Sequence, residues 1–277
     1  MAALLVAAGL GNGAWRLWLK SGDLLRPVVV LRRMDAAALA QPSLGARLAA
    51  LGGAPVPATA RPKLIALTFD DGPYPVTTPL LLQTLRDLRV PATFFLIGRD
   101  AEQFPDLARA IAAGGHEIAD HTLTHPNLDQ LDAAAVAKEL RDGAAVLDAI
   151  VPDPAERTLF RPPHGRYTAA TLRVAQAAGY DTILWSDDPG DWRAVTGPTL
   201  RAHLLQHATA PEIVLLHSGR MPTIAMLPAL VTDFRRAGYT FVTVGTLLRT
   251  TTPEQLNRPA RTPLDASGGT DPGGERL

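Results

Sequence analysis

The chain has 277 residues, enough for one domain with a sizeable buried core. Its 27 lysines and arginines balance 27 aspartates and glutamates, so no excess charge favours nucleic acid or an anionic membrane as a partner. The absence of cysteine excludes disulfides, thiolate metal sites and cysteine nucleophiles. Any metal must therefore be held by histidine and carboxylate side chains.

Residues 1–61 are predicted to be an N-terminal lead-in and linker. The apolar run at residues 2–8 resembles the middle of a secretion signal, although no basic residue precedes it. The run is shorter than the roughly 20 apolar residues that span a bilayer, so no stable membrane span is expected. We interpret it as a truncated signal or anchor, which favours an extracytoplasmic protein, either secreted or held in the cell envelope. No pattern indicates an oligomeric state.

From residue 62 to 250, short apolar runs alternate with helical periodicities. The alternation predicts a parallel sheet with outer helices, and about seven repeats favour a closed or nearly closed barrel over an open doubly wound sheet. Residues 251–277 lack periodicity and are predicted to be disordered. The predicted strands are 64–69, 92–97, 117–119, 159–161, 182–185, 213–216 and 240–244, and the predicted helices are 77–88, 102–113, 133–150, 168–178, 198–207 and 224–237.

Two adjacent carboxylates, Asp70 and Asp71, follow the first predicted strand and precede a Gly-Pro turn. Neighbouring negative charges repel, so each must be solvated, paired or bound to a cation. The carboxyl-terminal edge of a parallel sheet is also where sites form. An ordinary polar turn is the alternative, and on this segment alone it has equal weight.

Two histidines, His121 and His125, follow the third predicted strand. Side chains four residues apart share a face if the segment makes a helical turn, so both imidazoles can reach one cation. One aspartate would complete an N,N,O ligand set that leaves a position open for water. The histidine pair alone is a weak signal, and the carboxylate pair at another strand end strengthens it.

Polar groups follow three further strands. Arg161 precedes the segment Pro-Pro-His-Gly. The arginine can hold a carboxylate ionised, and the stiff turn can aim a backbone N–H at an oxyanion. The alternative is a proline-rich turn with a surface arginine. Three aspartates lie between Trp185 and Trp192. His217 ends an apolar strand, where a lone histidine is more often structural. It is, however, the fifth polar group at one predicted edge.

Five segments in this order resemble the motifs of polysaccharide deacetylases, the NodB-homology or family 4 carbohydrate esterases. They are residues 68–72, 121–125, 161–165, 188–192 and 213–217, and the resemblance covers residues 62–250. It implies a distorted (β/α) barrel of about seven parallel strands. It also implies a divalent metal ion, Zn²⁺ first with Co²⁺ or Ni²⁺ as alternatives, held by Asp71, His121 and His125.

The resemblance also assigns catalytic roles. Asp70 would be the base that takes a proton from metal-bound water, and His217 the acid that protonates the leaving amine. Arg161 would orient Asp70, and Asp188 would raise the pKa of His217. The backbone N–H of His164 would stabilise the oxyanion. The implied substrate-binding residues are His164, Pro163, Trp192 and Leu215, the last two lining a pocket for the acetyl methyl group.

Two positions depart from the family pattern. His164 stands where many relatives carry tyrosine, but the expected role belongs to the main chain, so activity should survive. Asp187 stands where relatives often carry an apolar residue.

The predicted function is a metal-dependent hydrolase that removes N-acetyl groups from a glycan, such as peptidoglycan or a chitin-like oligosaccharide. Two alternatives keep the fold and the metal chemistry: an O-acetyl xylan esterase and a cyclic-amide C–N hydrolase. A non-catalytic glycan-binding module is a third alternative. It is less favoured because degenerate relatives typically lose a ligand or the base, whereas this chain keeps Asp70, Asp71, His121, His125 and His217.

Overall fold

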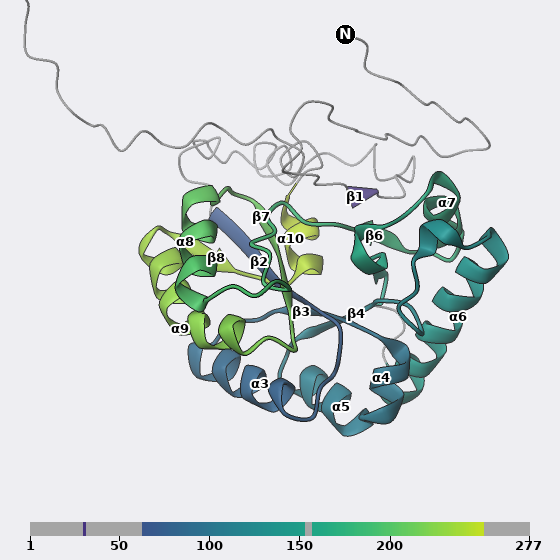
Figure 1. The fold of residues 1–277 in the computed structure, drawn as a ribbon, viewed down its shortest axis with the longest axis horizontal. Helices are drawn as coiled ribbons and strands as arrows, with labels where there is room; N and C mark the ends of the chain where they lie inside the picture. Colours follow the sequence, from purple (N-terminus) through teal and green to yellow (C-terminus); the bar gives the residue numbers. More distant parts are fainter. Residues whose placement is uncertain (1–29, 32–62, 153–156, 252–277) are drawn as a thin grey trace, which may run out of the picture.

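The computed structural model describes residues 30–31, 63–152 and 157–251. Helices surround a curved sheet (Figure 1). The strands are β1 (Val30–Leu31), β2 (Lys63–Asp70), β3 (Thr93–Leu96), β4 (Glu117–Asp120), β5 (Leu159–Phe160), β6 (Asp181–Ile183), β7 (Glu212–His217) and β8 (Tyr239–Phe241). The α-helices are α3 (Thr77–Leu88), α4 (Gly98–Gln103), α5 (Pro105–Ala113), α6 (Ala133–Ile150), α7 (Ala169–Ala177), α8 (Gly197–His207), α9 (Met221–Arg236) and α10 (Val244–Thr250).

The sheet has the order β1-β6-β5-β4-β3-β2-β7, and β8 also pairs with β2. Apart from β1, which is antiparallel to β6, the pairs are parallel. Just after β6, Asp187 forms an isolated parallel bridge with Val214 of β7. This bridge brings the two sides of the sheet together, so the prediction of a distorted, nearly closed (β/α) barrel is confirmed.

Side chains along β2 alternate between the outer and the inner face of the sheet. Ile65, Leu67 and Phe69 belong to the core between the sheet and the helices α3, α5, α8 and α9. Leu64 and Ala66 belong to a second core inside the curved sheet. Because successive side chains of a strand point to opposite faces, Asp70 lies on the inner face at the carboxyl end of β2.

Two helical segments differ from the prediction. The expected helix at 102–113 is divided into α4 and α5, since Pro105 begins α5 and the residue before a proline is disfavoured in a helix. The sequence interpretation also missed α10, whose Val244, Leu247 and Leu248 pack against the inner residues of the strands. Thr243 caps α10 by accepting a hydrogen bond from the Thr246 N–H.

Most of the predicted lead-in and tail lies outside the described residues. Of residues 1–61 only β1 is described, within the apolar run at 28–31, and the described chain ends at residue 251. Among the helices of the described part, none combines the length and apolarity needed to cross a membrane.

Candidate active site

A buried arginine fixes the first carboxylate at the end of β2. Arg161 has no exposed surface and Asp70 is only 4% exposed. Nη1 of Arg161 donates to Oδ1 of Asp70 at 2.6 Å and to Oγ1 of Thr68 at 2.8 Å. The remaining guanidinium nitrogens donate to the backbone oxygens of Ile183 and Leu184, at 3.2 Å and 3.0 Å. Asp70 is thus held as a paired and oriented carboxylate.

The three residues expected to bind a metal lie together. Nε2 of His125 is 3.3 Å from Oδ1 of Asp71, and Nε2 of His121 is 3.8 Å from the same oxygen. Nε2 of His121 is also 3.7 Å from Oδ2 of Asp70. The ligand atoms of Asp71, His121 and His125 all lie within 4.8 Å of one another, so these residues could hold a metal ion.

The chemistry of this donor set fits a divalent cation. Nδ1 of His121 is 2.8 Å from the backbone oxygen of Arg161. A carbonyl only accepts, so Nδ1 carries the hydrogen and the lone pair of Nε2 faces the carboxylates. Burial lowers the pKa of His125 to about 3, with His121 and His164 acting in the same direction, so its imidazole is neutral at neutral pH. Two imidazoles beside a carboxylate are typical ligands of a zinc-like ion.

Backbone strain is concentrated around these ligands. Four site residues adopt the left-handed region that non-glycine residues rarely occupy: Asp71 (φ 68°), Thr122 (φ 70°), His125 (φ 62°) and His164 (φ 57°). Such conformations each cost roughly 1–3 kcal/mol and persist where surrounding contacts determine them. The turns therefore present side chains in positions that regular structure would not give.

A buried aspartate supports the histidine turn. Oδ1 of Asp120 accepts a 2.6 Å hydrogen bond from the Thr122 N–H, and Oδ2 accepts one of 2.7 Å from the Tyr180 hydroxyl. Thr122 in turn accepts a hydrogen bond from the His125 N–H at 3.0 Å. Burial raises the pKa of Asp120 to about 7, although both hydrogen bonds lower it. These contacts link the end of β4 to the conformation of both histidines.

His217 has a different carboxylate partner from the one expected. Nδ1 of His217 is 2.6 Å from Oδ1 of Asp191, and its backbone N–H donates to Oδ2 of Asp191 at 2.9 Å. Asp188 was the wrong choice, because its carboxylate instead accepts the Gly190 N–H at 2.8 Å and holds the turn before Asp191. The three nearby aspartates were visible in the sequence, but their spacing does not show which one faces β7.

The charges around His217 favour its protonated form. Burial lowers the pKa of His217, but the hydrogen bond to Asp191 and the charges of Asp70, Asp191 and Asp71 outweigh burial and raise it to about 9. At neutral pH the side chain is therefore a cation that can donate a proton.

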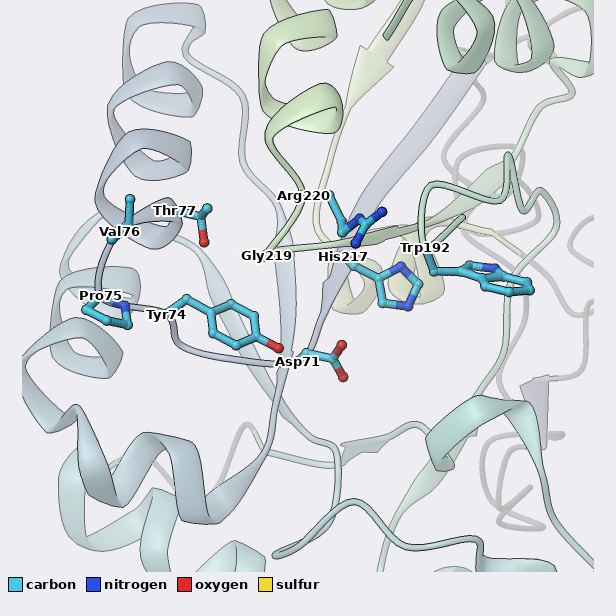
Figure 2. A pocket seen from close by; sticks show the side chains of 9 residues that line it. All are labelled: Asp71, Tyr74, Pro75, Val76, Thr77, Trp192, His217, Gly219 and Arg220. Atoms are coloured by element: carbon cyan, nitrogen blue, oxygen red, sulfur yellow. The ribbon is translucent and has the colours of Figure 1, made fainter. Parts of the chain in front are cut away.

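A cavity of about 410 Å³ opens beside Asp71 and His217 (Figure 2). In Figure 2 both side chains extend into it, with Tyr74 on one side and Trp192 on the other. Trp192 is 51% exposed and carries the Arg193 guanidinium 4.5 Å from its ring centre. The full lining is Asp71, Tyr74, Pro75, Val76, Thr77, Trp192, His217, Gly219 and Arg220.

The other expected substrate-binding residues lie at different depths. Leu215 is 4% exposed and is not one of the residues that line this cavity. Pro163 is buried, whereas His164 is exposed and its ring packs edge-on against His125, with centroids 4.5 Å apart. The His164 side chain therefore contacts His125, one of the three residues that could hold a metal ion.

Sequence reasoning missed Tyr74 and Arg220 in the cavity lining. Tyr74 follows the Gly-Pro turn, and Arg220 donates from Nε to the backbone oxygen of Asp191 at 2.9 Å. Burial raises the pKa of Tyr74 to about 12, with Asp71 acting in the same direction. Both residues lie in connections between predicted elements, where no periodicity indicates which way a side chain points.

The geometry agrees with comparisons to known proteins. The model of the polysaccharide deacetylase family matches residues 58–183. The chain is 38% identical over 192 residues to a peptidoglycan-N-acetylglucosamine deacetylase of Bacillus cereus, covering 68% of this chain and 89% of that protein. It is 39% identical over 158 residues to a chitooligosaccharide deacetylase of Rhizobium leguminosarum bv. trifolii, covering 57% and 73%.

A solved structure agrees as well. The peptidoglycan deacetylase PdaC from Bacillus subtilis has a TM-score of 0.63 and 28% identity to this chain, covering 69% of this chain and 92% of that one. Deacetylases of this kind are hydrolases of carbon–nitrogen bonds in linear amides. The chain belongs to the polysaccharide deacetylase family, the NodB-homology or family 4 carbohydrate esterases.

Proposed function

We propose that this protein is a metal-dependent N-deacetylase that removes acetyl groups from N-acetylated glycans, with peptidoglycan and chitin-like oligosaccharides as the substrate class. One observation carries the proposal. Asp71, one of the proposed ligands, and His217, the partner of Asp191, line one cavity, and the fixed carboxylate of Asp70 lies beside His121. A hydrolase of amides needs this combination of base, electrophile and acid.

Asp71, His121 and His125 would hold the ion. A divalent cation there, Zn²⁺ first with Co²⁺ or Ni²⁺ as alternatives, would lower the pKa of a water molecule and polarise the acetamide carbonyl. Arg161 occupies Oδ1 of Asp70 and leaves Oδ2 on the side of His121. Asp70 would use that oxygen to accept a proton from the attacking water.

The leaving amine must gain a proton, whereas the attacking water loses one to Asp70. When the carbon–nitrogen bond breaks, the sugar nitrogen must gain a proton, and protonated His217 faces the cavity to supply it. Asp191 holds Nδ1 of His217, so Nε2 carries the transferable hydrogen. The backbone N–H of His164, presented by its left-handed turn, would stabilise the negative oxygen that develops on the acetyl group.

The cavity fits a sugar chain rather than a compact apolar ligand. An exposed tryptophan, Trp192, offers a flat face to a sugar ring, while Arg220 and the Tyr74 hydroxyl supply hydrogen-bonding groups. The two named curated relatives act on peptidoglycan N-acetylglucosamine and on chitooligosaccharides, which supports an N-acetylglucosamine-containing substrate. Action on such glycans is also consistent with an extracytoplasmic location. We further propose that residues 62–250 form the deacetylase domain.

The deciding experiment measures acetate release from N-acetylglucosamine oligomers and from acetylated xylan. We expect release from the oligomers that stops on chelation, returns with Zn²⁺ and is lost in Asp70→Asn by about 10²–10⁴-fold. Asp70→Asn should retain the metal, since Asp70 is outside the proposed ligand set. Release from xylan alone would overturn the N-acetyl assignment in favour of O-acetyl esters, and a protein that binds no metal would overturn the proposed chemistry.

A further inference from the structure

We propose that Asp187, His203 and His207 form a second divalent-metal site, which joins α8 to the segment that carries Asp191. The ligand atoms of these three residues lie within 4.8 Å of one another. None of the three belongs to the catalytic group described above. The inference rests on its own geometry and does not depend on the proposed function.

The carboxylate of this cluster is buried. Asp187 is only 3% exposed, and its backbone oxygen accepts the Leu215 N–H at 2.9 Å, which places it alongside β7. Oδ1 of Asp187 is 2.9 Å from Nε2 of His203. A carboxylate in such a position needs a cationic or hydrogen-bonding partner, and α8 supplies two imidazoles on the side facing it.

The two histidines are arranged as helical metal ligands. His203 and His207 are four residues apart on α8, so they lie on one face, and their ring centroids are 4.3 Å apart. Nδ1 of His207 is 2.9 Å from the backbone oxygen of His203. That carbonyl can only accept, so Nδ1 carries the hydrogen and the lone pair of His207 is on Nε2, the tautomer that coordinates a metal.

Small movements would complete the site. Ligand atoms about 2.0–2.2 Å from a tetrahedral zinc ion lie roughly 3.3 Å from one another, close to the separation of Asp187 and His203. On binding, the hydrogen on Nε2 of His203 would shift to Nδ1, leaving the Nε2 lone pair for the metal. The competing explanation is a hydrogen-bonded Asp187–His203 pair that binds no ion, and the metal count below distinguishes the two.

The position of the cluster defines what the ion would do. Asp187 starts the segment that reaches Asp191, the partner of His217, and its carboxylate contacts His203 of α8. An ion held by Asp187 and two residues of α8 would restrain that segment. It would therefore act as a structural site that stabilises the fold around the proposed acid.

The test counts metal ions bound to the full chain. Metal-free protein is titrated with Zn²⁺, and the bound ions are counted by native mass spectrometry. We expect two ions on the wild type, loss of one in His207→Gln, loss of the other in His125→Gln and loss of both in the double variant. Gln206→Ala, an exposed change on the same turn of α8, serves as the control and should keep both ions.

A second readout separates metal binding from misfolding. Co²⁺ replaces Zn²⁺, and its visible absorption reports tetrahedral nitrogen and oxygen ligands; the increment from the second equivalent should disappear in His207→Gln while circular dichroism stays unchanged. A wild type that binds one ion, lost only in His125→Gln, would overturn this site and leave the proposed function intact. Two ions without deacetylase activity would overturn the proposed function and support this site.

Discussion

Nδ1 of His217 lies 2.6 Å from Oδ1 of Asp191, and the same carboxylate also accepts the backbone N–H of His217 and the hydroxyl of Thr223. Asp191 is 2% exposed, so this pairing takes place away from solvent. The carboxylate is thus fixed by three hydrogen bonds, one of which is to the Nδ1 edge of the imidazole. A proton on His217 is stabilised by a partner that cannot turn away.

Replacing Asp191 by asparagine should lower the pKa of His217, because the hydrogen bond to the carboxylate and its negative charge both raise that pKa against the effect of burial. Protonated His217 is the acid in the proposed reaction, so activity is lost as pH rises through its pKa. The pair contributes roughly 1.5–3 kcal/mol, which corresponds to about 1–2 pKa units. The alkaline limb of the kcat/KM profile should therefore move by that amount to lower pH.

Asp188→Asn is the matched control for this measurement. Its carboxylate accepts the Gly190 N–H, and an amide oxygen at the same place can accept it too. The alkaline limb should stay where it is in wild type. An equal shift in both variants would contradict the assignment of Asp191 as the partner of His217.

Arg161→Met should reduce the free energy of unfolding by about 3–5 kcal/mol, because it leaves the charge of Asp70 buried without its partner. Urea unfolding measures the loss. Adding Asp70→Asn to the same chain should recover part of it, since the uncompensated charge is then removed. The control is Arg166→Met: Arg166 pairs with Asp129 near the surface, where such a pair contributes about 0–1 kcal/mol. Similar losses in the two arginine variants would refute a special role for Arg161.

Gly165→Ala should destabilise the turn that presents His164. Gly165 has φ 65°, and an added Cβ would lie 2.6 Å from the Trp185 ring. Gly179 also has positive φ (90°) but no atom within 4 Å of the added Cβ, so Gly179→Ala measures the backbone cost alone. We expect about 1–2 kcal/mol for Gly179→Ala and about 1–3 kcal/mol more for Gly165→Ala, measured by urea unfolding. Equal losses of unfolding free energy in the two variants would show that the Trp185 ring moves aside at no energetic cost.

Local patterns were sufficient to predict much of the barrel and the clustering of Asp71, His121 and His125. Apolar runs ending in Asp70 and His217 identify strand ends, and parallel strands bring such ends to one edge. The break before Pro105 could also have been predicted from the proline, which disfavours helix at the preceding residue.

Other features depend on contacts between distant segments. The choice of Asp191 over Asp188 follows from the turn held by Gly190, and neither spacing nor composition encodes that turn direction. The helix α10 is only seven residues long, too short to show a reliable period, and it is stabilised by packing inside the sheet. Tyr74 enters the cavity through a turn, where side-chain direction is set by backbone conformation rather than by periodicity.

Trp192→Ala should weaken the binding of glycan oligomers more than it slows the chemical step. The ring is half exposed and lines the cavity on the side opposite Tyr74 (Figure 2), so we expect it to contact a sugar ring rather than the reacting bond. An aromatic contact worth about 0.5–1.5 kcal/mol corresponds to a rise in KM of roughly 2–10-fold, with kcat changed little.

Met221→Ala is the control, because Met221 is similarly exposed, at 49%, but does not line the cavity. Steady-state acetate release over a series of oligomer lengths measures both constants. A fall in kcat with KM unchanged would place Trp192 at the reacting group instead, as the acetyl-pocket assignment requires.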